Sequence, residues 1–93
     1  MNPYNHHQLT DNSFRRIFGI DTHDHELVWH RDRNARLVKV IEGQGWKFQH
    51  DNGIPITMNP GDTIEIPAEQ YHRIIKGSGQ LIVEIIEHDT GLS

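Results

Sequence analysis

Histidine is the residue type that gives this sequence most of its chemical potential. Eight histidines occur among 93 residues, and a neutral imidazole can ligate a metal ion or transfer a proton near neutral pH. His6 and His7 lie in a polar N-terminal stretch and are predicted to belong to a solvent-exposed tail. Metal ligands or proton-transfer groups are therefore expected among the other histidines.

The sequence offers little for covalent or nucleotide-dependent catalysis. It contains no cysteine, so neither a disulfide nor a thiol nucleophile is possible. No G-x-S-x-G motif occurs, and neither Ser13 nor Ser78 stands near a histidine in a recognisable arrangement. Gly43-Gln44-Gly45 separates two predicted strands rather than a strand and a helix, which argues against a phosphate-binding loop.

Length and charge narrow the class of protein. A chain of 93 residues has the size of one domain. Its net charge of -4 gives no overall field that would attract nucleic acid or an anionic membrane. The most apolar run, residues 81–86, is too short to span a bilayer, and the lack of cysteine is typical of a reducing compartment. We therefore predict a cytoplasmic protein without nucleic-acid or membrane partners.

Turn-forming residues divide the chain into short strands. Glycine, proline and asparagine recur about every 8 to 10 residues, as at Asn52-Gly53 and Gly77-Ser78-Gly79, which is the spacing of β-hairpins. The runs between them are rich in β-branched and aromatic residues, and no window shows the apolar spacing of an amphipathic helix. The predicted strands are residues 13–20, 26–30, 36–41, 46–50, 54–58, 63–66, 72–76 and 81–87. About eight short antiparallel strands in one small domain predict an all-β sandwich, jelly roll or barrel.

Two groups of residues in these strands have the spacing of known motifs. Val40-Ile41-Glu42-Gly43 ends one predicted strand with an apolar pair and a glycine. The pattern G-x5-P-x-G-x2-H-x3-N is matched at Gly61, Pro67 and His72. Glu69 and Lys76 replace its second glycine and its asparagine. In these features residues 29–76 resemble the cupin superfamily. The resemblance implies a double-stranded β-helix, the jelly-roll barrel of cupins, with about eight short antiparallel strands.

The same resemblance implies a metal site. The first cupin motif is H-x-H-x3-E-x6-G, and counting back from Gly43 places its two histidines at His30 and Asp32 and its glutamate at Arg36. The histidine of the second motif is His72. The ligand set that the resemblance implies is therefore His30, Asp32 and His72, with an arginine in place of the glutamate.

Two histidines and a carboxylate are the ligands typical of non-haem iron and similar divalent metals. His30 and Asp32 are two residues apart, so on an extended chain their side chains share a face. One interpretation is a site for Fe, Mn, Ni or Zn in a small dioxygenase, isomerase or lyase, with Arg36 clamping the carboxylate or phosphate of a small anionic or sugar-like ligand. His23-Asp24-His25 offers a second H-x-H, but it lies too far from Gly43 to fit the motif well.

A metal-free interpretation stays open. Arg36 cannot ligate a metal and could instead form an ion pair with Asp32, leaving the histidines as hydrogen-bonded pocket residues. The protein would then be a binding module that recognises a small molecule through Arg36 and Trp46, or a structural or regulatory cupin with a vestigial site. Trp46 could form an aromatic wall for a sugar or a ring, although the simplest role for a tryptophan on a strand is in the core.

The N-terminal segment contains apolar side chains that need cover, namely Phe14, Ile17, Phe18 and Ile20. They are expected to add a strand to the barrel or to cross to a second subunit, as in many small cupins, so a homodimer is predicted. The single domain at residues 1–93 is expected to comprise an arm at 1–25, a barrel at 26–88 and a frayed tail at 89–93.

Overall fold

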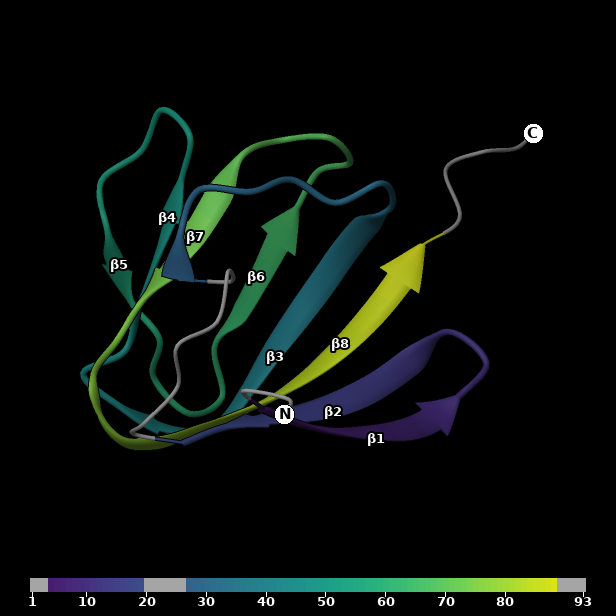
Figure 1. Cartoon of the computed structure of the whole chain (residues 1–93), viewed down its shortest axis with the longest axis horizontal. Helices are drawn as coiled ribbons and strands as arrows, with labels where there is room; N and C mark the ends of the chain where they lie inside the picture. The colour runs from purple at the N-terminus through teal and green to yellow at the C-terminus, as the bar shows by residue number, and fades with distance from the viewer. Residues whose placement is uncertain (1–3, 20–26, 89–93) are drawn as a thin grey trace.

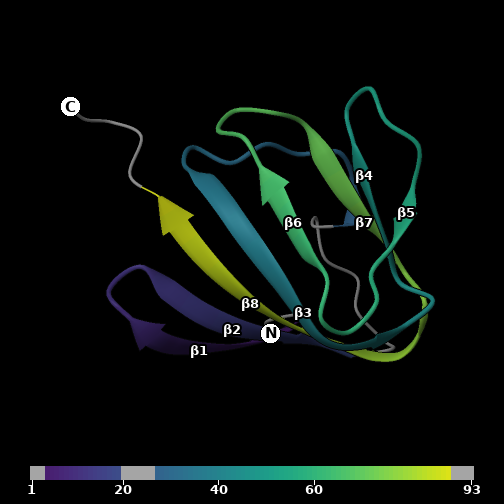
Figure 2. The ribbon, with the colours of Figure 1, turned by 180° about the vertical axis from the view of Figure 1, so that it is seen from behind.

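The computed structural model describes residues 4–19 and 27–88, which form an all-β barrel of two sheets (Figure 1). The strands are β1 (Tyr4–Thr10), β2 (Ser13–Phe18), β3 (Ala35–Gln44), β4 (Lys47–His50), β5 (Ile56–Thr57), β6 (Thr63–Ile66), β7 (His72–Ile75) and β8 (Ser78–His88). A five-stranded sheet has the order β1-β2-β8-β3-β6, a three-stranded sheet has the order β5-β4-β7, and neighbouring strands are antiparallel. Figure 2 shows from behind that the three-stranded sheet lies beyond β6, while the β1-β2 hairpin lies at the other edge of the large sheet.

The barrel core is built from alternate residues of the strands. On β8, Leu81, Val83 and Ile85 are buried and the residues between them are half-buried, as the two-residue period of a strand requires. β2 places Phe14 opposite Ile85 and Phe18 opposite Leu81, so aromatic rings pack beside aliphatic side chains of the next strand. The buried apolar residues are Phe14, Phe18, Val38, Val40, Trp46, Phe48, Met58, Ile64, Ile66, Ile74, Leu81, Val83 and Ile85.

One end of the barrel is closed by a tight backbone crossing. Gly77, between β7 and β8, lies so close to the end of β3 that a Cβ atom there would collide with the backbone nitrogen of Trp46 and the backbone oxygen of Gln44. Only a residue without a Cβ fits this space. Gln44 ends β3 and Arg36 is near its start, so the crossing and the candidate site lie at opposite ends of the barrel.

The eight antiparallel strands of the described residues confirm the all-β fold class predicted from the sequence. Two predictions about individual segments are wrong. Residues 4–10 form the edge strand β1 rather than a tail, although His6 and His7 are exposed as expected. The sequence did not indicate this strand because β1 is polar and lacks an apolar pattern, and backbone pairing with β2 holds it in place. In the described part of the strand predicted at 26–30, only His30 makes a bridge, and its partner is His72.

Part of the predicted N-terminal arm belongs to the large sheet. Residues 13–18 form β2, and Phe14 and Phe18 are covered within their own chain. Three features named from the sequence lie outside the described residues: Ile20, the second H-x-H at 23–25 and the predicted frayed tail at 89–93. No helix in the described ranges is long and apolar enough to cross a membrane.

Candidate metal centre

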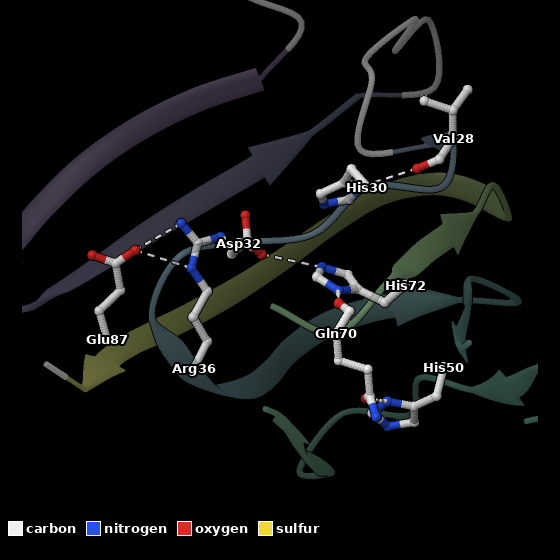
Figure 3. Close-up of polar contacts among 8 residues, drawn as sticks. All are labelled: Val28, His30, Asp32, Arg36, His50, Gln70, His72 and Glu87. Carbon is white, nitrogen blue, oxygen red and sulfur yellow. Dashed lines mark hydrogen bonds and ion pairs between the residues drawn. The ribbon is translucent and has the colours of Figure 1, made fainter. Parts of the chain in front are cut away.

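A short backbone pairing brings the candidate ligands together. The backbone N–H of His30 donates to the backbone oxygen of His72 at 3.0 Å, and the backbone N–H of His72 donates to the backbone oxygen of His30 at 2.8 Å. Directly opposed residues point to the same face, and the two imidazole rings meet edge to face with their centroids 4.3 Å apart. Asp32 follows His30 by two residues and points toward His72 (Figure 3).

The three side chains form a compact set of possible ligands. One ligand atom from each of His30, Asp32 and His72 lies within 4.8 Å of the others. His72 is buried, and the other two residues are half-buried. The structure thus brings together the three residues that the cupin resemblance implied as metal ligands, and we call them the ligand set.

Backbone carbonyl groups orient both imidazole rings. His30 Nδ1 donates to the Val28 oxygen at 2.9 Å, and His72 Nδ1 donates to the Gln70 oxygen at 3.0 Å. A carbonyl oxygen can only accept, so the hydrogen of each neutral ring is on Nδ1 and the lone pair is on Nε2. Metal-binding histidines are commonly held in this way, because the hydrogen bond fixes the tautomer and the ring orientation.

The carboxyl group of Asp32 favours its ionised form. Its Oδ2 lies 3.2 Å from His72 Nε2 and 3.4 Å from Arg36 Nη1. Burial raises the pKa of Asp32, but the hydrogen bond with His72 and the positive charge of Arg36 outweigh burial and lower this pKa below its ordinary value. A carboxylate oxygen and an imidazole lone pair repel each other at this distance. The contact therefore requires a positive charge, which either a proton on His72 Nε2 or a metal ion can supply.

Arg36 is held mainly by an acidic residue that was not predicted from the sequence. Its Nε and Nη2 both donate to Glu87 Oε2, at 3.0 and 2.7 Å, and the two residues are opposite each other in the β3–β8 register. The contact of Arg36 with Asp32 is longer, so Glu87 is its principal partner. A signal for Glu87 exists in the sequence, because it is in phase with the inward-facing Val83 and Ile85.

Gln70 holds two histidines at once. Its backbone oxygen accepts from His72 Nδ1, and its side-chain Oε1 accepts from His50 Nδ1 at 2.9 Å (Figure 3). His50 is opposite His72 in the β4–β7 register, so His30, His72 and His50 form a row across three neighbouring segments. No partner for His50 could be identified from the sequence, because the Gln70 contact depends on the path of the turn between β6 and β7.

This turn is also tied to the segment that carries the ligands. The backbone N–H of Glu69 donates to the backbone carbonyl oxygen of Asp32 at 2.7 Å. Glu69 has a φ of 60°, a backbone conformation that costs a non-glycine residue about 1 kcal/mol or more. It stands where the second cupin motif has glycine, which is the residue that adopts this conformation without strain.

The two predicted ligand-contact residues lie in different surroundings. Arg36 lines a cavity of about 20 Å³ together with Phe48 and His72. Trp46 is fully buried near the closed end of the barrel, with its ring centroid 6.3 Å from that of Phe18. Complete burial favours the core role for Trp46. The cavity has room for about one water molecule, so an organic ligand would have to bind outside it.

Comparisons with known proteins bear on the fold. The sequence matches no protein-family model and no curated protein. A chain from the structures of the DMSP lyases RdDddP and RnDddQII has a TM-score of 0.73 and 20% identity, over 86% of this chain and 39% of that chain. A putative mannose-6-phosphate isomerase from Ralstonia eutropha JMP134 has a TM-score of 0.69 and 18% identity, over 94% and 83% of the two chains. A cupin-like protein from Thermotoga maritima has a TM-score of 0.68 and 20% identity, over 87% and 59%.

These similarities confirm the cupin fold predicted from the motifs. The chain spans 39% of the DMSP lyase chain and 59% of the Thermotoga chain, so it matches one part of each.

Proposed function

The chain has a cupin fold, and on that premise we propose that His30, Asp32 and His72 hold one divalent metal ion for chemistry on a small molecule. The observation that carries the proposal is the pair of Nδ1 hydrogen bonds to backbone carbonyls, because they leave two Nε2 lone pairs beside an ionised carboxylate. When both imidazoles are neutral, the three ligand atoms lie within 4.8 Å of one another with their lone pairs unshared, and a divalent cation between them would remove this repulsion.

The chemistry of the ligand set suits several metals. Imidazole and carboxylate ligands are compatible with Fe, Mn, Ni and Zn, and three protein ligands leave positions open for water or a substrate. When bound, the metal would supply a Lewis acid for a substrate oxygen or, as iron, a redox centre. The protein residues have distinct tasks. Asp32 contributes negative charge, and the buried His72 holds its Nε2 at a set position beside Asp32.

The proposed activity is that of a small metal-dependent lyase, isomerase or dioxygenase. Two of the similar solved structures are named as a lyase and as an isomerase, which supports the first two classes. The proposed ligand is small and anionic or sugar-like. Arg36 supports an anionic group, because its guanidinium lies next to the ligand set. Because the interior cavity has room for only about one water molecule, we propose that the ligand binds at the end of the barrel where the ligand set lies.

A second candidate function is metal-free binding of a small molecule. The 3.4 Å contact between Arg36 Nη1 and Asp32 Oδ2 favours it, since that ion pair could replace a metal. The shorter contacts of Arg36 with Glu87 weigh against it, because they compensate the arginine without Asp32. If the metal-free candidate is right, a ligand should raise the unfolding temperature, and this stabilisation should persist when a chelator is added.

Elemental mass spectrometry of tag-free protein tests the metal proposal. We expect about one metal ion per chain, and we expect His30→Ala and His72→Ala each to reduce metal affinity by at least a hundredfold, because each removes one of three ligands. His7→Ala is the matched control, since His7 is exposed on the edge strand β1 and should keep full metal content. A folded wild-type protein that refuses added metal would leave the metal-free candidate as the better function.

Some further properties stay predictions. They are a homodimer, a cytoplasmic location and the absence of nucleic-acid and membrane partners.

A further inference from the structure

We infer that the site takes its metal together with a small oxyanion, such as a carboxylate, and that Arg36 anchors this anion. The inference rests on the proposed function, since it names the ligand class of the same site. The residues that carry it are Arg36, Asp32 and Glu87, whose side chains are 12%, 16% and 30% exposed.

The charge of this cluster changes sign when a divalent cation enters. Asp32 and Glu87 are negative and Arg36 is positive, so the cluster alone has a surplus of one negative charge. A divalent cation converts this into a surplus of one positive charge. Because the side chains are largely shielded from solvent, the surplus is screened less than it would be in bulk water. Binding of an anion beside the metal is therefore favourable.

A second guanidinium lies in the same region. The guanidinium carbons of Arg16 and Arg36 lie 4.8 and 5.7 Å from the ring centroid of Phe14. Both arginines also line the small cavity that borders His72, and they reach it from β2 and β3, on either side of β8. Arginine is the residue best suited to hydrogen-bond planar oxyanions, so this arrangement favours an anion over a neutral sugar.

The hydrogen bonds of Arg36 indicate how it would hold the anion. Nε and Nη2 donate to Glu87, which fixes the plane of the guanidinium. Nη1 faces Asp32 Oδ2, the same atom that contacts His72 Nε2. A metal held by Asp32 and His72 would draw on this oxygen and weaken its contact with Nη1, which leaves Nη1 able to donate to another acceptor. An oxyanion bound beside the metal supplies one.

The test is whether an anion strengthens metal binding. Metal-free protein is titrated calorimetrically with Co²⁺ in sodium acetate and, in parallel, in acetamide with sodium chloride at the same ionic strength. We expect acetate to lower the Kd for Co²⁺ by about tenfold relative to acetamide, which is an ordinary coupling between two sites. The visible absorption of bound Co²⁺ should also change on addition of acetate. Weak binding of acetate to free Co²⁺ opposes this effect and cannot produce it.

Substitutions locate the coupling at Arg36. Arg36→Gln should reduce the acetate effect to less than about twofold. The double variant Arg36→Gln with Glu87→Gln avoids leaving Glu87 without its partner, and it serves if the single variant does not fold. Arg33→Gln is the matched control, because Arg33 carries the same charge in the same segment but is exposed. It should keep the full acetate effect.

The possible results separate this inference from the function on which it rests. Equal Co²⁺ affinities in acetate and acetamide would overturn the inference and leave the metal site intact. An acetate effect that persists in both Arg36 variants would overturn the anchoring role of Arg36. Failure of the folded wild-type protein to bind Co²⁺ in either solution would overturn the metal site and the inference together.

Discussion

Each imidazole of the ligand set depends on one backbone carbonyl, at Val28 for His30 and at Gln70 for His72. Because these acceptors are backbone atoms, no single side-chain deletion removes them. The basic nitrogen that each ring presents is therefore determined by the path of the chain before His30 and before His72. A change in either path would turn the ring or change its tautomer while leaving every ligand residue in place.

The ionisation of Asp32 leads to a prediction about pH. Because the pKa of folded Asp32 is lowered, its ionised form stabilises the fold above the ordinary pKa of 3.8, and this contribution is lost as the pH falls through the lower folded value. In metal-free protein, Asp32→Asn should therefore reduce the free energy of unfolding more at about pH 5 than at about pH 3. Urea unfolding at each pH measures the difference.

Asp51→Asn is the control for this experiment, since it removes the same charge from a side chain that is exposed in the turn after β4. Its effect on unfolding should vary less between the two pH values. If the effect of Asp32→Asn instead grew on acidification, the lowered pKa would be wrong.

The turn between β6 and β7 carries strain that a substitution can release. Glu69 has a φ of 60°, and its ion pair with Arg31 spans 3.4 Å between side chains that are 58% and 55% exposed. An exposed pair contributes little, whereas the backbone strain costs about 1 kcal/mol. Glu69→Gly should thus raise the free energy of unfolding by about 0.5 to 1 kcal/mol in urea denaturation. It should not change metal affinity, because Glu69 contacts Asp32 through its backbone N–H.

Ala68→Gly is the matched control for the turn, because Ala68 is not among the residues with positive φ. It should be neutral or destabilising, since glycine there adds freedom to the unfolded chain without relieving strain. Loss of stability in Glu69→Gly would show that the ion pair with Arg31 outweighs the strain.

At the level of strands, the sequence predicts which residues come together when the spacing of a motif agrees with the two-residue period of a strand. The motif spacing and the two-residue period place His30 and Asp32 on one face, and the second motif adds His72. Glu87 is different, because its pairing with Arg36 depends on the β3–β8 register between residues far apart in the chain. β1 could not be predicted because an exposed edge strand needs no apolar pattern, only a neighbour with free backbone groups.

For the whole molecule, burial of Phe14 and Phe18 within their own barrel removes the strongest argument from sequence for a partner. The outer face of the large sheet provides another argument. There Leu37 is opposite Ile86 on β8, and Ile17 is opposite Ile82. Ile86 is exposed and the others are half-buried, so this face offers apolar area that a second copy could cover.

The homodimer prediction is tested by sedimentation equilibrium at micromolar concentration, with a mass of two chains as the expected result. Ile86→Glu should weaken association at least tenfold, because it places a charge in the apolar face. Ile54→Glu is the control, since Ile54 is 80% exposed in the segment between β4 and β5, and its substitution should not affect the mass. A wild-type mass of one chain would contradict the prediction.

The bridge between His30 and His72 also bears on how the chain stays folded. A metal held there would cross-link two segments separated by about 40 residues, which restricts the unfolded chain much as a covalent link does. In a cysteine-free domain of 93 residues, the ion would take the place that disulfides have in other small domains. Loaded protein would then unfold at higher temperature than empty protein, so metal supply would control how much folded protein persists as well as how much is active.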